Sequence, residues 1–271
     1  MGQKVEVSGT GYDLKGGKPL IGGTAYAIKK GRTLIGGTGY DISLLSGTPI
    51  SELPVGNTVK IAVNGTLRDF LIVHQGLPGA MYDDSCNGAW LLMKDIYENR
   101  QWDSAGFNNY KASTINSYLN STFLSLFDSN IKDAIKQVKI PYRKNGGSGG
   151  TDQSGSNGLP AKIFLMSGYE VGWTTSDSSY FSVDGAKLSY FESGGGTSAN
   201  NKRIANLNGS AAAWWLRSPF TSLTYGVWTV GHNGVYGTYG GYTDASNSSG
   251  VRPALIFPSD TLVSDDGTIA T

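Results

Sequence analysis

Two short apolar stretches near the end of the chain, AWWLRSP (213–219) and GVRPALIF (250–257), each carry one arginine. Bulky aromatic and aliphatic side chains at this density anchor a hydrophobic core. A guanidinium group has five N–H donors, so one buried arginine can hold several loop carbonyls at once. We therefore expect the two stretches to form the framework of one domain, with at least one of the two arginines buried and linking the two ends.

The segment between these stretches has a different composition. HNGVYGTYGGYTD (232–244) is dominated by Tyr, Gly and Thr, and it shows neither a helical stripe nor a clean strand alternation. Tyrosine offers a large, rigid contact area, whereas Ser, Gly and Asn offer adaptable hydrogen bonding, as in antibody paratopes. The composition therefore predicts a recognition surface. The predicted ligand-binding residues are Phe220, Thr221, Ser222, Leu223, Thr224, Tyr225, Thr229, Gly231, His232, Val235, Tyr236, Thr238, Tyr239, Tyr242, Thr243 and Asp244.

The composition of the 271-residue chain excludes several classes of protein. Hydrophobic residues make up 39% and charged residues 16%, which is typical of a globular chain and not of a disordered one. A net charge of +1 predicts no long-range attraction to nucleic acid or to anionic membranes. The single cysteine, Cys86, excludes an intrachain disulfide. No apolar run has the length of a signal-peptide core or a membrane span, so we expect synthesis in a bacterial cytoplasm without a signal peptide.

The N-terminal part contains an internal repeat. GTGYDL (9–14), GTAYAI (23–28) and GTGYDI (37–42) follow one another with a period of 14 residues. Each unit predicts two short strands joined by a glycine turn. A unit this small cannot bury one face alone, so it must stack on its neighbours or on copies from other chains. We expect residues 1–50 to form an all-β repeat module for assembly or virion attachment; the alternative is a flexible leader.

The middle of the chain predicts strands followed by two helices. TVKIAVNGTLRDFLIVHQ (58–75) is typical of a hairpin with a type I′ turn at Asn64-Gly65, and GAWLLMKDI (88–96) predicts a further strand. Apolar spacings of three and four predict helices over 113–127, capped by Ser113, and over 128–138, capped by Asp128 or Ser129. Val138 belongs to the apolar stripe of the second helix. The Gly/Ser-rich stretch 144–158 predicts a mobile surface loop, and the order of elements predicts an α+β domain.

Few residues are candidates for catalysis. His74 lies inside the apolar run FLIVHQ and fits a core or strand-edge histidine better than a catalytic base. Asp83 and Asp84 could bind a metal, but a turn or cap is the more common role of such a pair. Cys86 has no histidine near it in sequence and fits a small buried side chain. Because HExxH and CxxC motifs are absent, we expect no catalytic residues, no metal site and no cofactor.

The framework stretches resemble the C-terminal signature of a C-type-lectin-type fold that occurs in phage and bacterial proteins and is related to the formylglycine-generating enzyme. The resemblance extends back through FLIVHQGLPGAMYDDSCNGAWLLMKDIYENRQW (70–102), NSYLNSTFLSLFDSNIKDAIKQVKIPYR (116–143) and KIFLMSGYEVGW (162–173), and covers roughly Pro54 to Val263. It implies a C-type-lectin-like ligand-binding domain over residues 51–271, with two helices and short strands. The framework residues that we expect are Trp214, Trp215, Arg217, Trp228 and Arg252.

Members of this family often serve as variable proteins of diversity-generating retroelements, in which adenine-directed mutagenesis rewrites the residues between the framework stretches. The resemblance thus implies a variable region over 214–255. Mutating the adenines of an Asn codon cannot produce Lys, Glu, Gln, Met or Trp. Residues 220–249 contain none of the first four, and their one tryptophan, Trp228, resembles a framework element of the family. The alternative is a Gly- and Tyr-rich region that is poor in charge for ordinary reasons.

The chain departs from two relatives of this fold. The formylglycine-generating enzyme uses paired cysteines, whereas Cys86 is the single cysteine here, so that activity should be absent. Calcium-dependent sugar-binding lectins carry EPN, QPD or WND motifs, and none of these occurs. Calcium-dependent sugar binding is therefore not supported, and recognition of a protein or a sugar through another surface stays open.

The leading hypothesis is a non-enzymatic adhesin or phage tail receptor-binding protein, located on a virion or a bacterial cell surface. Its partner would be a cell-surface protein or glycan, with no role for nucleic acid or membrane insertion. Residues 1–50 would bind virion proteins or form a homo-oligomer, for which we favour a trimer. The alternatives are an enzyme of the formylglycine-generating-enzyme-like fold and a structural virion protein without a specific ligand.

Overall fold

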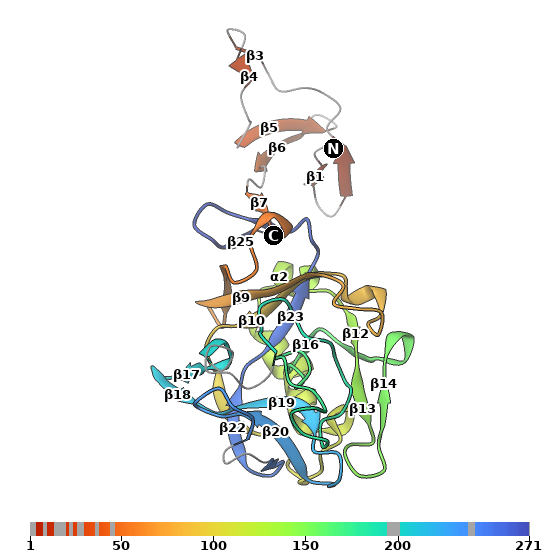
Figure 1. The fold of residues 1–271 in the computed structure, drawn as a ribbon. Coiled ribbons are helices and arrows are strands. Elements are labelled where there is room, and N and C mark those ends of the chain that lie inside the picture. The colour runs from red at the N-terminus through yellow and green to blue at the C-terminus, as the bar shows by residue number, and fades with distance from the viewer. Residues whose placement is uncertain are drawn as a thin grey trace.

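The computed structural model describes residues 47–193, 201–237 and 242–270, together with the backbone of six short strands within residues 4–43 (Figure 1). The chain is mixed α+β, with many short strands and few helices. Two five-stranded sheets carry most of the domain, and smaller sheets of two or three strands surround them. The α+β class that the sequence predicts is confirmed at this level.

The first large sheet has the strand order β16-β23-β10-β9-β8 and is antiparallel throughout. Its central strands β10 and β23 are buried at every position, which explains their unbroken apolar sequence. The predicted hairpin is confirmed, because Asn64 and Gly65 both have positive φ, 51° and 71°, as a type I′ turn requires. The strands are β8 (Thr58–Val63), β9 (Thr66–Gly76), β10 (Gly88–Met93), β16 (Ile163–Phe164) and β23 (Ala254–Phe257).

The second large sheet has the order β11-β22-β19-β20-β21 and contains the first framework stretch and the start of the second, whose residues 254–257 form β23 of the first sheet. β19 and β22 are neighbours and run parallel, with Trp214 opposite Gly250. A Cβ at Gly250 would lie 2.7 Å from the carbonyl oxygen of Ala213, so glycine is required for this close approach. The strands are β11 (Glu98–Gln101), β19 (Trp214–Pro219), β20 (Gly226–Val230), β21 (Thr243–Asp244) and β22 (Ser248–Val251).

The two predicted helices are present but shorter than expected. Helix α1 (Thr114–Tyr118) continues as a π-turn and a 3₁₀ turn to Leu126, and the Oγ of Ser113 accepts a hydrogen bond from the N–H of Asn116 at 3.2 Å. The predicted cap is thus confirmed. Helix α2 (Ser129–Ala134) ends before Val138, and its N-cap residue makes no side-chain capping bond.

The prediction that Val138 extends the second helix is wrong. Val138 begins strand β12 (Val138–Ile140), which pairs with β15 (Leu159–Ala161). Pairing with a distant segment overrides the local periodicity, and Val138 is buried in either case. Sequence spacing alone cannot separate these outcomes over so short a run.

Several small sheets complete the domain. The three-stranded sheet β25-β24-β7 brings the start of the domain beside its C-terminal residues, at the end opposite β20 and β22 (Figure 1). The segment before residue 47 therefore joins the domain far from the loops around β20. The short strands are β7 (Thr48–Pro49), β13 (Tyr142–Lys144), β14 (Thr151–Gln153), β17 (Ala205–Leu207), β18 (Ser210–Ala212), β24 (Leu262–Val263) and β25 (Ile269–Ala270).

The N-terminal repeat forms three antiparallel hairpins. The innermost pairs are Val7–Thr10, Ile21–Thr24 and Ile35–Thr38, so the register recurs with the 14-residue period of the sequence. The paired strands belong to consecutive units, so the prediction that the two strands of one unit are joined by its own glycine turn is wrong in its pairing, and stacking of the units stays a prediction. The strands are β1 (Lys4–Val7), β2 (Thr10–Asp13), β3 (Leu20–Ile21), β4 (Thr24–Ala25), β5 (Lys30–Ile35) and β6 (Thr38–Ser43).

The core is rich in tryptophan. All six tryptophans of the chain are buried, including Trp214, Trp215 and Trp228, as the sequence predicts for framework residues. Five of them, all but Trp173, donate their indole N–H to backbone carbonyls; Trp214 donates to Arg203 and Trp215 to Arg100, at 2.9 and 2.8 Å. Indole rings thus supply apolar volume without leaving a buried donor unpaired. Among the described residues, no helix is long and apolar enough to cross a membrane.

Candidate functional site

The framework arginine of β19 is buried and ties several loops together. Arg217 donates to the carbonyl oxygens of Pro141, Leu165 and Asp184, at 2.7 to 2.9 Å. It also forms a bidentate ion pair with Glu170, with N–O distances of 2.6 and 2.7 Å. Burial alone would lower the pKa of Arg217, but the charge and hydrogen bonds of Glu170 raise it above its ordinary value. The predicted role of this arginine is confirmed.

The framework arginine that follows β22 links the two stretches directly. Arg252 is buried and donates to the carbonyl oxygens of Met93 and Lys94, at 2.8 and 2.9 Å. Its guanidinium carbon lies 4.8 Å from the ring centroid of Trp214, at the start of the other stretch. Burial lowers its pKa to about 10, so it keeps its charge at neutral pH. The expected bridge between the two framework ends is therefore present.

A buried polar cluster around Arg217 was missed by the sequence analysis. Tyr82 donates to Glu170 at 2.9 Å, and Ser218 lies within 3.0 Å of both carboxylate oxygens of Asp184. Burial raises the pKa of Asp184 to about 7. Glu170 and Asp184 are each 0% exposed, so no substrate reaches them and the cluster connects loops. One signal was present in the sequence: Glu170 is the only acid within the apolar run 162–173.

Aromatic rings connect the core to the surface between the two framework stretches. Phe220 lies 5.0 Å from the buried ring of Trp228, measured between centroids, and 5.0 Å from Tyr242. Tyr242 contacts Tyr225 at 5.7 Å in a nearly perpendicular arrangement, and Tyr180 stacks on Phe220 at 4.5 Å. Tyr180, Tyr225 and Tyr242 are 44%, 42% and 37% exposed. We call Tyr180, Phe220, Tyr225 and Tyr242 the aromatic face.

The loop 220–226 carries Phe220 and Tyr225 of the aromatic face, and buried residues next to it hold its backbone by hydrogen bonds. Asn108 is 2% exposed, and its Nδ2 donates to the carbonyl oxygens of Leu223 and Gly226, at 3.0 and 2.7 Å. Its backbone N–H donates to Thr224 at 2.8 Å. A Cβ at Gly226 would lie 2.7 Å from the ring of Tyr242, so glycine leaves room for that ring. The loop backbone is thus preorganised while its side chains stay free.

The Gly/Ser-rich stretch contributes to this support, which corrects its interpretation as a mobile surface loop. The strands β13 and β14 pair within it, and Gly147 is buried. The N–H of Gly147 donates to the Oδ1 of Asn108 at 2.9 Å. A Cβ at Gly147 would lie 2.1 Å from the carbonyl oxygen of Phe220. Glycine is used here because two backbones meet at close range, and composition alone does not distinguish that use from flexibility.

The structure distributes the predicted ligand-binding residues over three environments. Those that are exposed are Ser222, Thr224, Tyr225, His232, Tyr242 and Asp244. Those that are half-buried are Phe220, Thr221, Leu223, Val235, Tyr236 and Thr243. Thr229 and Gly231 are buried, and Thr238 and Tyr239 lie outside the described residues.

Three of these placements correct the predicted surface. Thr229 is 0% exposed in the middle of β20, with its Oγ1 lying 3.3 Å from that of Thr243. Gly231 is also buried, so neither residue presents a side chain at the surface. The ring of Tyr236 packs on the core, 5.6 Å from Trp173 and 5.5 Å from Trp228, and its hydroxyl donates to the carbonyl oxygen of Asp177. Tyr236 therefore supports the surface from beneath.

Two exposed aromatic residues outside the framework stretches lie next to this surface. Tyr180 accepts a backbone hydrogen bond from Thr221 at 3.1 Å, and Phe107, which is 60% exposed, precedes the loop anchor Asn108. Neither was predicted, because both are separated from the recognition segment by tens of residues. Only the folded chain brings them to it.

The candidate catalytic residues occupy structural positions. The Sγ of Cys86 is buried and donates to the carbonyl oxygen of Lys139, and burial raises its pKa to about 12, so it is not a nucleophile at neutral pH. Asp83 caps a 3₁₀ turn by accepting from the N–H of Ser85 at 3.0 Å, as expected. The Nδ1 of His74 lies 2.8 Å from the Oγ of Ser189, and burial lowers its pKa. Within the described ranges, no group of three His, Cys, Asp or Glu residues could hold a metal ion.

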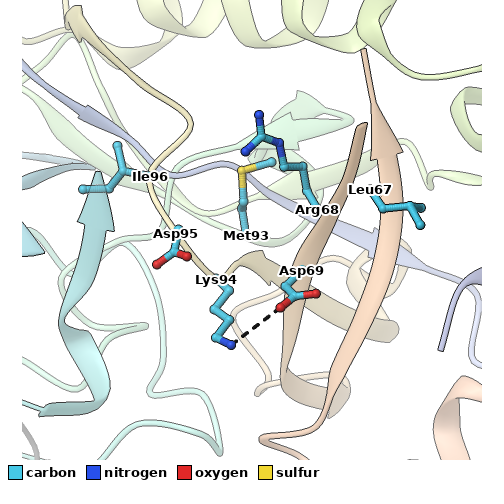
Figure 2. A pocket seen from close by; sticks show the side chains of 7 residues that line it. All are labelled: Leu67, Arg68, Asp69, Met93, Lys94, Asp95 and Ile96. Carbon is cyan, nitrogen blue, oxygen red and sulfur yellow. Dashed lines mark ion pairs between the residues drawn. The ribbon is translucent and has the colours of Figure 1, made fainter. Parts of the chain in front are cut away.

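A hollow of about 250 Å³ lies between β9 and the segment after β10. Figure 2 shows Asp69 and Lys94 directed toward each other; their ion pair measures 3.6 Å and is half-exposed. Arg68 and Asp95 add one further charge of each sign at its rim. Opposite charges that are already paired offer little to a charged ligand, and solvent screening weakens them further. The hollow is therefore a weaker candidate than the aromatic face.

Comparison with known proteins identifies the family. The family model described as "Domain of unknown function (DUF6273)" matches residues 87–259, and the chain belongs to this family. The match begins just before β10 and includes both framework stretches and the aromatic face. Searches of the curated proteins and of the solved structures found no match.

Proposed function

We propose that this chain is a ligand-binding protein, an adhesin or phage tail receptor-binding protein, whose aromatic face contacts the ligand. The observation that carries the proposal is the cluster of exposed tyrosines, Tyr180, Tyr225 and Tyr242, around a loop whose backbone Asn108 holds. Exposed aromatic clusters mark interaction sites, and rigid aromatic anchors bind at a low entropic cost. Among the residues that the structure describes, the titratable cluster of Glu170 and Asp184 is closed to solvent, whereas the aromatic face is exposed, which favours binding over catalysis.

Within the α+β class, we propose that the domain has a C-type-lectin-like fold with a diversified region over 214–255. Three observations support it: the two framework stretches are adjacent strands, both of their arginines are buried, and exposed side chains lie between them. Residues 220–249 also contain no Lys, Glu, Gln or Met, the residues that mutated Asn codons cannot encode. Sequencing the gene neighbourhood tests the diversification; we expect a reverse transcriptase gene beside a near-copy of the coding sequence for this region.

Attachment to a virion or cell surface through residues 1–50 is the second part of the proposal. The N-terminal segment joins the domain at the β7–β24–β25 sheet, opposite β20, so attachment there leaves the aromatic face free (Figure 1). Self-association of the hairpins, for which we favour a trimer, would add avidity. Light scattering on the full chain and on a chain starting at Ser51 tests this; a monomeric full chain at tens of micromolar would leave the repeats as a docking segment.

Binding to bacterial cells tests the function itself. The labelled full chain is added to a panel of bacterial strains, and bound protein is measured by flow cytometry. We expect the double variant Tyr225→Ala/Tyr242→Ala to lose at least tenfold in cell binding while its circular dichroism and Tm stay close to those of the parent. The matched control is Leu67→Ala, an exposed apolar residue on another part of the domain. Unchanged cell binding by the double variant would refute the assignment of the face.

A further inference from the structure

A second hollow lies at the edge of the second large sheet that β11 and β22 form. It has a volume of about 450 Å³ and is lined only by polar residues: Asn99, Arg100, Gln101, Ser104, Thr114 and Ser248. Three of them lie on β11, and Ser248 begins β22, so strands of the second large sheet position most of the lining. A concave site that offers many hydrogen-bonding groups and no apolar side chain suits a ligand rich in hydroxyl groups.

The lining side chains have hydrogen-bonding capacity left for a ligand. The Nε2 of Gln101 donates to the carbonyl oxygen of Ser246 at 2.7 Å, which fixes the amide and leaves its Oε1 free to accept. Within the described part of the chain, the side chains of Asn99, Ser104 and Ser248 have no hydrogen-bond partner in the protein. Donors and acceptors are therefore both present around one space.

The charge balance of the hollow favours a neutral ligand. The guanidinium carbon of Arg100 lies 3.7 Å from the ring centroid of Tyr118, and its Nε donates to the Oε1 of Glu98 at 2.9 Å. The stacking fixes the arginine, and the carboxylate offsets its charge. The adjoining segment 220–249 contains no Lys or Arg, and Asp244 is its only acid. A phosphate or carboxylate group would find no unpaired cation here.

The hollow and the aromatic face border the same segment of chain. The N–H groups of Trp102 and Asp103 donate to the carbonyl oxygen of Ala245, at 3.0 and 2.9 Å, and the N–H of Ala245 donates to Tyr225 at 2.9 Å. The segment 244–248 thus has the polar hollow on one side and Tyr225 on the other. A ligand of several units can place one unit in the hollow and lay the next against a tyrosine ring.

We propose that this hollow binds a neutral saccharide unit, a hexose or an N-acetylhexosamine, of a glycan whose neighbouring units contact the aromatic face. The inference rests on the proposed function and names its ligand class. Ring hydroxyls exchange hydrogen bonds with Asn99, Gln101, Ser104 and Ser248, and the amphipathic tyrosines contact the apolar face of the next ring.

The test uses the full chain on an array of immobilised neutral glycans that end in hexoses or N-acetylhexosamines. Isothermal titration with the tightest-binding free oligosaccharide then compares variants. We expect Asn99→Ala/Ser104→Ala to weaken its binding at least tenfold with an unchanged Tm. The matched control, Asn57→Ala/Ser51→Ala, removes the same groups from exposed positions near β8 and should bind as the parent does.

Two outcomes overturn the inference. One is binding of the parent chain to cells without binding to any neutral glycan on the array, which points to a protein ligand and leaves the proposed function intact. The other is full glycan affinity in Asn99→Ala/Ser104→Ala. Failure of the proposed function is a separate result, namely unchanged cell binding by Tyr225→Ala/Tyr242→Ala.

Discussion

The framework strands β19 and β22 use their side chains in the opposite way from the segment that connects them. In the framework, the arginine and tryptophan side chains are buried and make the contacts that join distant loops. In the loop 220–226, backbone carbonyls make those contacts, with Asn108 as the partner, and the tyrosine at its end is exposed. A loop held by its backbone tolerates changes of side chain. A region built in this way can therefore vary its surface while keeping its shape.

The largest expected effect comes from removing the partner of Arg217. Glu170→Ala leaves a buried guanidinium without its carboxylate, and the hydroxyl of Tyr82 loses its acceptor. We expect the free energy of unfolding to fall by about 3–5 kcal/mol. Urea denaturation measures this, and a loss below about 1 kcal/mol would show that the framework does not depend on the ion pair.

The buried carboxyl group of Asp184 should make stability depend on pH. Burial raises its pKa to about 7 from 3.8, and Arg217, Glu170 and Asp152 are the charged groups that act on it. Between these pH values the folded state binds this proton more tightly than the unfolded state does. The stabilisation that the protonated carboxyl group gives is therefore complete below about pH 4 and is lost as the pH rises through 7. We expect the Tm difference between the parent and Asp184→Asn to shift in favour of the variant from pH 5 to pH 8. A constant difference would contradict the assignment.

Removing the hydrogen bonds that hold the loop 220–226 tests the contrast between the framework and the loop, with a smaller expected effect on stability. Asn108→Ala removes the side-chain donor to the carbonyls of Leu223 and Gly226, which keep one backbone donor each, and it leaves the N–H of Gly147 without its acceptor. We expect a loss of about 1–3 kcal/mol in the free energy of unfolding, and weaker ligand binding because the loop is no longer preorganised. The exposed Asn57→Ala is the control, with a change within about 0.5 kcal/mol. Thermal unfolding and ligand titration read the two effects separately.

The smallest effect is expected at the exposed face. Tyr242→Ala should change the free energy of unfolding by less than about 1 kcal/mol, since the ring is 37% exposed. Tyr236→Ala should cost about 1–3 kcal/mol, because that ring contacts Trp173 and Trp228. Chemical denaturation gives the free energy of unfolding of both variants. A larger loss in Tyr242→Ala than in Tyr236→Ala would mean that Tyr242 supports the core and Tyr236 belongs to the surface.

The recognition surface shows how far composition can predict a site. The Tyr- and Gly-rich segment was located from its residues alone, and six of the residues predicted to contact the ligand, three of them in this segment, are exposed. The burial of Thr229 and Gly231 was not predicted, since exposure in a strand depends on what covers each face. Tyr180 and Phe107 were missed because their positions at the surface follow from the packing of distant loops.

Local features of this chain were determined by the sequence itself. Asn64-Gly65 favours positive φ at both residues, Ser113 supplies a capping oxygen, and the 14-residue period sets the hairpin register, because each depends on a few neighbouring residues. Tertiary structure alone decided the parallel pairing of Trp214 with Gly250, the ion pair of Arg217 with Glu170, and the strand at Val138. These contacts join segments far apart in the chain. Their free energy depends on the whole packed core, which no short stretch of sequence specifies.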